Sequence, residues 1–303
     1  MMKFQIKPVT LADKELLDRY FVNNNSINSE YTFTNMFMWQ ESYNIRYAII
    51  GGMLCIFAQH GSSAETVNFP LGEGDLKSVV ETLIDYFNDL GQKPLIRLYR
   101  QEDIDRLNEA FPDKFIFTED RASFDYVYKI ADLIELSGKD YHAKKNHINR
   151  FLAKYPNYES IEITPENLHL CYDMFERWCE AKADSVAGID EQRLAVEKLF
   201  DNYTRLSVKG FGIIVDGKLI AFSIGEVLNK DKSFAVIHLE HADTDYQGSF
   251  PLINQQFLVH QWSNFEYVNR EEDMGLAGLR RAKKSYRPCL MVKKHIASLK
   301  NPK

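Results

Sequence analysis

The chain has 303 residues, 45% hydrophobic and 26% charged, which is enough for two globular domains and excludes a disordered protein. No apolar run reaches the roughly 18 residues of a membrane-spanning helix, and the N-terminal stretch MMKFQIKPVTLADKELL lacks the apolar centre of a signal peptide. The net charge of −6 is uneven, because residues 276–303 hold nine Lys and Arg and no acidic residue. Such a basic segment indicates an anion-binding surface or a solvated tail.

The first half alternates between helical and strand-like spacing. Thr10 and Asp13 have the spacing of a capping box, and Gly51-Gly52 is a favoured turn between two strand-like runs. The elements expected here are helices at 11–21, 34–39, 74–90 and 101–110, the hairpin IRYAIIGGMLCIFAQ at 45–59, and strands at 94–99 and 124–130.

The second half repeats this order. Thr164 is the expected N-cap of a helix that has Pro165 at its first position, and Asp216-Gly217 is the strongest hairpin signal in the chain. The elements expected here are helices at 165–178, 190–203, 252–262 and 276–286, the hairpin GFGIIVDGKLIAFSIGEVL at 210–228, and strands at 233–240, 265–268 and 290–295.

Three short patterns recur in the same order in both halves, which indicates an internal duplication. They are Met36-Phe37-x-Trp39 with Met174-Phe175-x-x-Trp178, IIGGMLCIF at 49–57 with IVDGKLIAF at 214–222, and Phe69-Pro70-Leu71 with Phe250-Pro251-Leu252. We therefore expect two domains, residues 1–150 and 151–303, bridged by the basic helical segment GKDYHAKKNHINRFLAKY at 138–155.

The order of elements predicts an α/β (α+β) fold class. Each half reads as helices, then a hairpin, then alternating helix and strand, which favours a mixed, mostly antiparallel sheet flanked by helices. This order is close to that of the GNAT acyltransferase fold, whose cleft opens where two neighbouring strands separate. We predict a tandem duplication of such a fold.

Two polar segments carry a more specific resemblance. They are LSGKDYHAKKNHINRF at 136–151 and YVNREEDMGLAGLRRAKKSYRP at 267–288. With them, nearly the whole chain resembles a bacterial family of uncharacterised proteins related to the C-terminal catalytic region of phosphatidylglycerol lysyltransferases, which is distantly similar to the Fem-type aminoacyltransferases. The resemblance implies a tandem GNAT fold and transfer of an aminoacyl or acyl group, with aminoacyl-tRNA as the donor.

The sequence departs from this family's relatives in two places. The large membrane-embedded region of the lysyltransferases is missing, which makes a lipid headgroup the weaker of the two expected acceptors, the other being a small molecule. The acetyl-CoA loop Q/R-x-x-G-x-G/A is also missing. Its counterpart, ADTDYQGSFP at 242–251, has one glycine and two aspartates and is a poor cradle for a pyrophosphate. Acyl-CoA is therefore the weaker donor, and we expect no other cofactor.

The candidate catalytic residues follow the third strand of the second half. The polar run His238-Leu239-Glu240-His241-Ala242-Asp243 would place His238 and Glu240 on one face and His241 on the other. Glu240 is a candidate general base if burial raises its pKa, or else the partner of a structural ion pair. His241 is a second candidate base, and Tyr286, which shares a helix face with Lys283, is the third candidate catalytic residue.

The candidate donor-binding residues lie mainly in the second polar segment. Asn269 and Arg270 follow a strand at its carboxyl end, where α/β sites gather, and Arg270 suits a carboxylate or phosphate. Asp273 is a candidate cap of the following helix. Arg280, Lys283 and Lys284 form one basic stripe, either for the phosphates of a tRNA acceptor end or for salt bridges to Glu271-Glu272-Asp273.

The basic segment 138–155 adds Lys145 and Asn149 as further donor-binding candidates, although a structural helix between the domains is the favoured interpretation of this segment. The four cysteines form no CxxC pair, so we expect reduced thiols in a cytoplasmic protein and no metal site. The alternative to an enzyme is a binding or regulatory protein that keeps the fold without catalysis.

Overall fold

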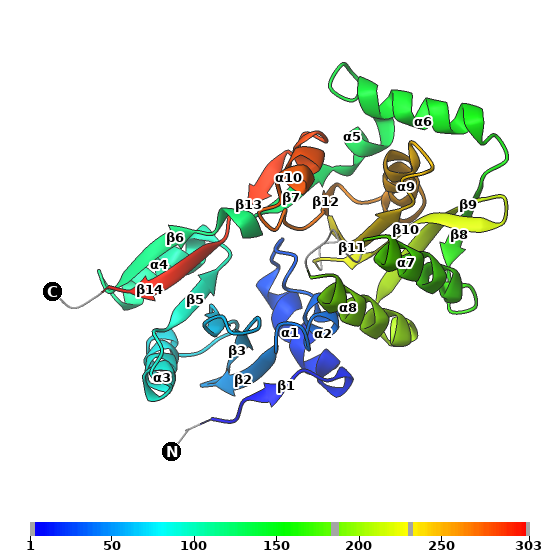
Figure 1. Ribbon diagram of the computed structural model, residues 1–303. Coiled ribbons are helices and arrows are strands. Elements are labelled where there is room, and N and C mark those ends of the chain that lie inside the picture. Colours follow the sequence, from blue (N-terminus) through cyan, green and yellow to red (C-terminus); the bar gives the residue numbers. More distant parts are fainter. Residues whose placement is uncertain (1–3, 183–187, 230–232, 301–303) are drawn as a thin grey trace. The chain divides into compact units, whose positions relative to one another are not determined.

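The computed structural model describes residues 4–182, 188–229 and 233–300, which form two compact units (Figure 1). Unit 1 lies within Met1–Phe124 and Val292–Lys303, and unit 2 lies within Asp125–Met291. The expected junction after residue 150 therefore falls inside unit 2, and the last strand of the chain returns to unit 1.

Unit 1 is one seven-stranded sheet with helices. Its strands are β1 (Lys7–Pro8), β2 (Arg46–Ile50), β3 (Met53–Ala58), β4 (Thr66–Asn68), β5 (Leu95–Leu98), β6 (Phe115–Glu119) and β14 (His295–Leu299). Its helices are α1 (Lys14–Asn24), α2 (Phe33–Met38), α3 (Leu76–Asp89) and α4 (Gln101–Ala110). The predicted capping box is present, since Thr10 N and Oγ1 both donate to Asp13 Oδ2.

Unit 2 is a second seven-stranded sheet with helices. Its strands are β7 (Asp125–Lys129), β8 (Glu159–Ile163), β9 (Val208–Val215), β10 (Lys218–Val227), β11 (Phe234–Ala242), β12 (Tyr267–Asn269) and β13 (Leu290–Val292), whose last residue is the first of the C-terminal part of unit 1. Its helices are α5 (Ile130–Glu135), α6 (His142–Lys154), α7 (Leu168–Lys182), α8 (Ile189–Asp201), α9 (Ser249–Phe257) with a π-helical turn at Leu258–Trp262, and α10 (Ala277–Lys284).

The two sheets have the same strand order. It is β1-β2-β3-β4-β5-β14-β6 in unit 1 and β8-β9-β10-β11-β12-β7-β13 in unit 2. In both orders the fourth and fifth strands pair in parallel, as β4 with β5 and β11 with β12. The sixth strand of each sheet comes from the other half of the chain, so β7 and β14 are exchanged between the repeats. This exchange explains why the units do not divide at residue 150.

Both predicted hairpins are present. β2 pairs with β3 across Gly51-Gly52, and β9 pairs with β10 across Asp216-Gly217. The backbone φ angles of 52° at Asp216 and 75° at Gly217 are the left-handed values that a two-residue hairpin turn requires.

The predicted start of α7 is wrong. Residues 165–167 form a turn, and α7 begins at Leu168. The side chain of Asn167 closes this turn, because its Oδ1 accepts from Thr164 N at 2.8 Å and its Nδ2 donates to Glu162 O at 2.9 Å. Thr164 is therefore held by the turn and does not cap the helix.

β11 and β12 separate along their length. They pair only through Phe234–Val236 and Tyr267–Asn269, although β11 continues to Ala242. On the other side of β11, Ile237 pairs with Gly225 and Leu239 with Ile224, so His238 is the extra residue of a β-bulge. The structure thus has a gap beside the carboxyl half of β11, as the predicted fold requires.

Helices cover both faces of the unit 2 sheet. Glu240 on β11 bonds to Asn254 of α9, whereas its neighbour His241 packs on Phe175 and Trp178 of α7. The predicted alternation of Glu240 and His241 between the two faces is therefore confirmed. In the described ranges, no helix has both the length and the apolar composition needed to cross a bilayer.

A substitution at Gly225 tests the β-bulge at His238. A Cβ atom at this position would lie 2.2 Å from Val236 O on the neighbouring strand. We expect Gly225→Ala to lower the free energy of unfolding by about 1–3 kcal/mol, measured by urea denaturation, because the backbone must shift. Gly278→Ala is the control, since a Cβ at Gly278 meets nothing within 4 Å and alanine favours the helix. Equal stability of both variants would contradict the bulge geometry.

Candidate functional site

Five side chains of unit 2 meet where β11 and β12 separate. We call them the Arg270 cluster: Tyr128 on β7, Lys144 on α6, Glu240 on β11, Arg270 directly after β12, and Tyr286, the second residue after α10. The cluster joins elements that are far apart in the sequence, and it lies at a strand's carboxyl end, as the sequence predicted for Arg270.

Arg270 is the centre of the cluster. Its Nη2 donates to Glu240 Oε1 at 2.7 Å, and its guanidinium lies 5.5 Å from the ring centroid of Tyr128 and 4.8 Å from that of Tyr286. Burial alone would lower the pKa of Arg270, but the charge and hydrogen bond of Glu240, together with the nearby Tyr128 and Tyr286, raise it. Nη1 is enclosed and has no hydrogen-bond partner among the described residues. A permanently charged group thus keeps an unused donor.

Both carboxylate oxygens of Glu240 accept a hydrogen bond from the protein. Oε1 accepts from Arg270 and Oε2 accepts from Asn254 Nδ2 at 3.0 Å. Its side chain is only 14% exposed. Of the two predicted roles, this geometry matches the ion pair better than the general base, because a base needs a free oxygen facing the substrate.

Lys144 and Tyr286 complete the cluster. Lys144 Nζ lies 4.2 Å from the centroid of the Tyr286 ring, and no described carboxylate pairs with this ammonium group. Burial, followed by the charge of Arg270, lowers the pKa of Lys144. Burial raises the pKa of Tyr286, so its hydroxyl stays protonated at neutral pH. The cluster therefore holds two cations and one carboxylate beside two neutral phenols.

His238 links the same strands through a second interaction. Its Nε2 lies 2.9 Å from Glu226 Oε1 on β10, and its Nδ1 lies 2.9 Å from Glu271 Oε1 beyond β12. Burial alone would lower the pKa of His238, but the two carboxylates raise it to about 9. An imidazolium at neutral pH donates to both acids, so His238 is a structural bridge and has no free nitrogen for catalysis.

His241 does not join the cluster. Its ring packs against Phe175, Trp178 and Phe222 on the opposite face of the sheet from Glu240. Burial lowers the pKa of His241 to about 4, which keeps it neutral. The structure therefore gives His241 the surroundings of a core residue.

Asn269 and Lys283 form hydrogen bonds that fix the backbone around Arg270. Asn269 is fully buried; its Nδ2 donates to Asp125 Oδ2 at 2.9 Å and its Oδ1 accepts from Glu271 N at 2.7 Å. Lys283 Nζ donates to the backbone carbonyls of Arg270 and Glu271. These contacts hold the backbone on both sides of Arg270.

Asp273 and Arg280 form a separate ion pair. Arg280 Nε and Nη2 lie 2.8 and 2.9 Å from the two carboxylate oxygens of Asp273, which also accepts from Tyr126 at 2.6 Å. Burial would raise the pKa of Asp273, but the donated hydrogen bonds hold it well below its usual range. Arg280 thus follows the salt-bridge alternative of the prediction. Asp273 caps no helix, because α10 begins at Ala277 without a side-chain cap.

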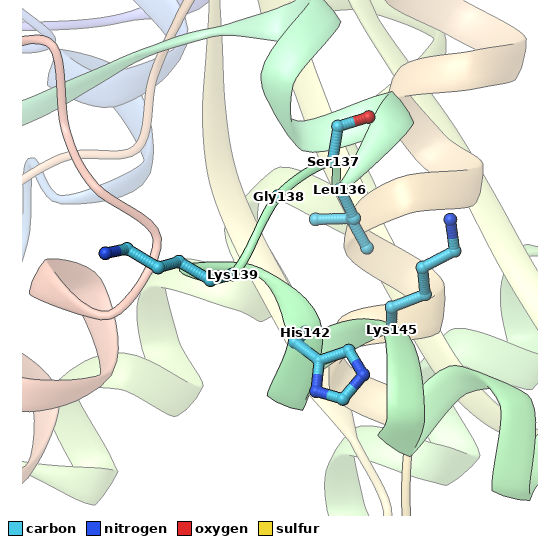
Figure 2. Close-up of a pocket in the computed structure, with 6 residues that line it drawn as sticks. All are labelled: Leu136, Ser137, Gly138, Lys139, His142 and Lys145. Carbon is cyan, nitrogen blue, oxygen red and sulfur yellow. The ribbon is translucent and has the colours of Figure 1, made fainter.

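Lys145 lies elsewhere on unit 2. It lines a hollow of about 460 Å³ with Ser137, Lys139 and His142, between the end of α5 and the first turn of α6 (Figure 2). Asn149, one turn further along α6, is exposed and does not line this hollow. Both residues lie on the exposed side of α6, and neither contacts the Arg270 cluster in the contacts of the described residues.

Lys144, Tyr128 and Asn254 are the residues that sequence reasoning missed. Lys144 had a signal: with Tyr141, Ile148 and Phe151 it lies on the inward stripe of α6, where a lysine is unusual. Tyr128 and Asn254 had none, because only the sheet and α9 bring them to Arg270.

The start of α9 is closed to a pyrophosphate. A Cβ at Gly248, the N-cap of α9, would lie 2.4 Å from His147 O of α6. The next residue, Ser249, is 1% exposed and donates to Asp243 O at 2.9 Å. α6 therefore covers the backbone that would have to approach the phosphates.

Residues 23–298 match the family described as the C-terminal region of phosphatidylglycerol lysyltransferase. The chain belongs to this family. An uncharacterised protein of Mycoplasmoides gallisepticum is 28% identical over 182 residues, which are 59% of this chain and 57% of that protein. The chain thus spans little more than half the length of this curated relative.

Solved structures extend the comparison. A conserved protein of unknown function from Bacteroides thetaiotaomicron is 34% identical, with a TM-score of 0.90 over 99% of this chain and 100% of that one. The C-terminal domain of a protein assigned as a lysylphosphatidylglycerol synthetase, from Agrobacterium fabrum, is 12% identical, with a TM-score of 0.67 over 96% of this chain and 93% of that one.

Two further structures share the fold alone. FemX has a TM-score of 0.59 at 9% identity, covering 96% of each chain. A tandem GNAT protein from the clavulanic acid biosynthesis pathway has a TM-score of 0.51 at 9% identity, covering 99% of this chain and 100% of that one. The predicted family and the predicted tandem GNAT-like fold are confirmed.

The bridge at His238 predicts a pH dependence of stability. Because its folded pKa of about 9 exceeds the ordinary 6.5, the bridge stabilises fully below pH 6.5, and this contribution is lost as the pH rises through 9. We expect the free energy of unfolding to fall by roughly 1–3 kcal/mol from this group. Urea unfolding at stepped pH should show a smaller fall for His238→Gln than for the wild type. An equal fall in both would contradict the assignment.

Proposed function

We propose that the protein is an acyltransferase that takes an aminoacyl group from aminoacyl-tRNA and transfers it to an amine or hydroxyl of a small molecule or a lipid headgroup. The observation that carries the proposal is the Arg270 cluster, which lies where the parallel strand pair of a GNAT-like sheet separates. Unit 2 is the proposed active unit and unit 1 the supporting one. The family of the chain supports the reaction class.

The charges of the cluster favour a negatively charged substrate group. Arg270 and Lys144 are opposed by the carboxylate of Glu240, which leaves one positive charge in excess. Arg270 Nη1 has no acceptor among the described residues. A buried donor without a partner is costly, and a phosphate or carboxylate oxygen would satisfy it. A phosphate of the tRNA acceptor end is the group we assign to it.

The chemistry needs few protein groups. The acceptor attacks the ester carbonyl of the aminoacyl-tRNA, the carbon–oxygen bond to the ribose breaks, and the ribose oxygen leaves with the acceptor's proton. The Tyr286 hydroxyl, kept protonated by burial, is the proposed hydrogen-bond donor to the tetrahedral oxyanion. Glu240 is a positioning residue that orients Arg270, because both of its oxygens are engaged.

Acyl-CoA is the weaker alternative donor. The packing of Gly248 against His147 leaves no room for a pyrophosphate at the start of α9. In contrast, Lys139 and Lys145 in the hollow beside α6 suit the phosphates of a longer donor. The proposed donor also implies that the protein acts in the cytoplasm, where aminoacyl-tRNA is made.

A second candidate function is ligand binding without catalysis. It is favoured by the lack of a free carboxylate or imidazole within the cluster, since Glu240 is fully paired and His241 lies on the other face. The two candidates differ in one measurable property. A binding protein is stabilised by the donor but moves no aminoacyl group.

The deciding experiment combines binding and transfer. We expect a non-hydrolysable aminoacyl-adenosine amide to raise the melting temperature and acetyl-CoA to leave it unchanged. Radiolabelled aminoacyl-tRNA should then pass its label to an acceptor mixture of amines and lipids. Stabilisation without transfer would support the binding protein, and stabilisation by acetyl-CoA alone would overturn the donor assignment.

Lys144→Met tests the cation next to Tyr286. The substitution keeps most of the length of the side chain and removes its charge, so donor binding should weaken by about tenfold, as for one lost charged hydrogen bond. Steady-state kinetics should show this change in KM for the tRNA. Arg150→Gln is the control, because Arg150 is exposed on the same helix and lies outside the cluster. A similar change in both variants would show that the whole basic helix matters and not Lys144.

Tyr286→Phe tests the proposed oxyanion donor. Removing the hydroxyl while keeping the ring should lower kcat by roughly 10²–10³, with little change in KM. Tyr128→Phe is the matched control, because the Tyr128 hydroxyl donates to Lys283 O and is already engaged by the protein. An unchanged kcat in Tyr286→Phe would rule this role out.

A further inference from the structure

The segment between the Arg270 cluster and α10 exposes two apolar side chains. Met274 is 58% and Leu276 53% exposed, the highest values among the exposed large hydrophobic residues of the described chain. They flank Gly275 and lie two residues apart. Exposed apolar side chains that lie close together are typical of a contact surface, whereas singly scattered ones are common on any protein.

The exposure of Met274 and Leu276 is built into the backbone. Met274 has a φ of 50° and Gly275 a φ of 75°, which are the left-handed values of a tight turn. The fully buried Asp273 stabilises this turn through two hydrogen bonds. Its Oδ1 accepts from Gly275 N at 2.9 Å, and its backbone carbonyl accepts from Leu276 N at 2.9 Å. The two apolar side chains therefore extend from an anchored turn.

α10 adds positive charge beside the turn. Its inward face carries Arg280 and Lys283, which bond to Asp273 and to backbone carbonyls. Its outward face carries Arg281 and Lys284, both exposed, and no described acidic residue pairs with either. In α10, two basic side chains thus bond to the protein and two are exposed to solvent.

Two exposed apolar residues, followed five to ten residues later by two exposed cations, fit the surface of an anionic membrane. Apolar side chains gain free energy in the headgroup region, and each nearby Lys or Arg adds about 1 kcal/mol at an anionic leaflet. A nucleic acid would attract the cations but would offer nothing to Met274 and Leu276. The exposed Met274 and Leu276 therefore favour a membrane over a nucleic acid as the partner.

We propose that residues 274–284, the docking segment, bind the surface of an anionic lipid membrane. Met274 and Leu276 enter the headgroup region, and Arg281 and Lys284 contact the lipid phosphates. The inference does not depend on the proposed transfer reaction, and it can hold or fail separately. If both hold, the acceptor would be met at a lipid surface, because the other face of α10 supports the backbone of Arg270.

Vesicle flotation tests the docking segment. The full chain is mixed with vesicles of phosphatidylcholine alone or of phosphatidylcholine with one-third phosphatidylglycerol. We expect binding to the anionic vesicles only. Met274→Ser/Leu276→Ser and Arg281→Gln/Lys284→Gln should each weaken it by about tenfold, because each removes one of the two contributions. These residues are exposed, so unchanged melting temperatures should accompany the loss.

Leu90→Ser/Leu194→Ser is the matched control, since both leucines are about as exposed and lie outside the docking segment. This variant should bind anionic vesicles as the wild type does. Absence of binding by the wild type would overturn the proposal. So would loss in the charge variant alone with competition by tRNA, because that outcome assigns the cations to a nucleic acid.

Discussion

The ion pair between Arg270 and Glu240 spans a gap that backbone hydrogen bonds no longer close. β11 and β12 pair as far as Val236 and Asn269 and then separate, so their later residues are joined through side chains. Breaking a buried ion pair on one side leaves a charge in a medium that solvates it poorly. Asn254 satisfies the second oxygen of Glu240, whereas Arg270 Nη1 has no described partner. At this end of the sheet, the Nη1 donor of Arg270 therefore lacks an acceptor among the described residues, and a negatively charged group would supply one.

The same gap is crossed a second time by His238. The bulge in β11 sets this histidine between Glu226 and Glu271, and the two carboxylates keep it charged. Glu271 has a φ of 57°, and the hydrogen bond from its N–H to Asn269 Oδ1 holds that conformation. Arg270 lies in the chain between Asn269 and Glu271, which this hydrogen bond joins. Its position is thus determined by neighbours on both sides as well as by Glu240.

The basic C-terminal part of the chain has more than one use. Arg280 neutralises a buried aspartate, Lys283 holds two carbonyls, and Arg281 and Lys284 remain in solvent. Composition alone offered an anion site or a solvated tail. The fold divides these basic residues between internal contacts and an outward surface, because successive positions of a helix face in different directions.

Local chemistry determined much of this protein from the sequence. The turns at Gly51-Gly52 and Asp216-Gly217, the capping box at Thr10, the repeated order of elements and the family follow from short patterns. The exchange of β7 and β14, the pairing of Glu240 with Arg270 and the approach of Tyr126 to Asp273 were decided only by tertiary structure. Tyr126 and Asp273 are 147 residues apart in the chain. Local patterns fix backbone angles, whereas the partner of a buried charge depends on which distant strands pack together.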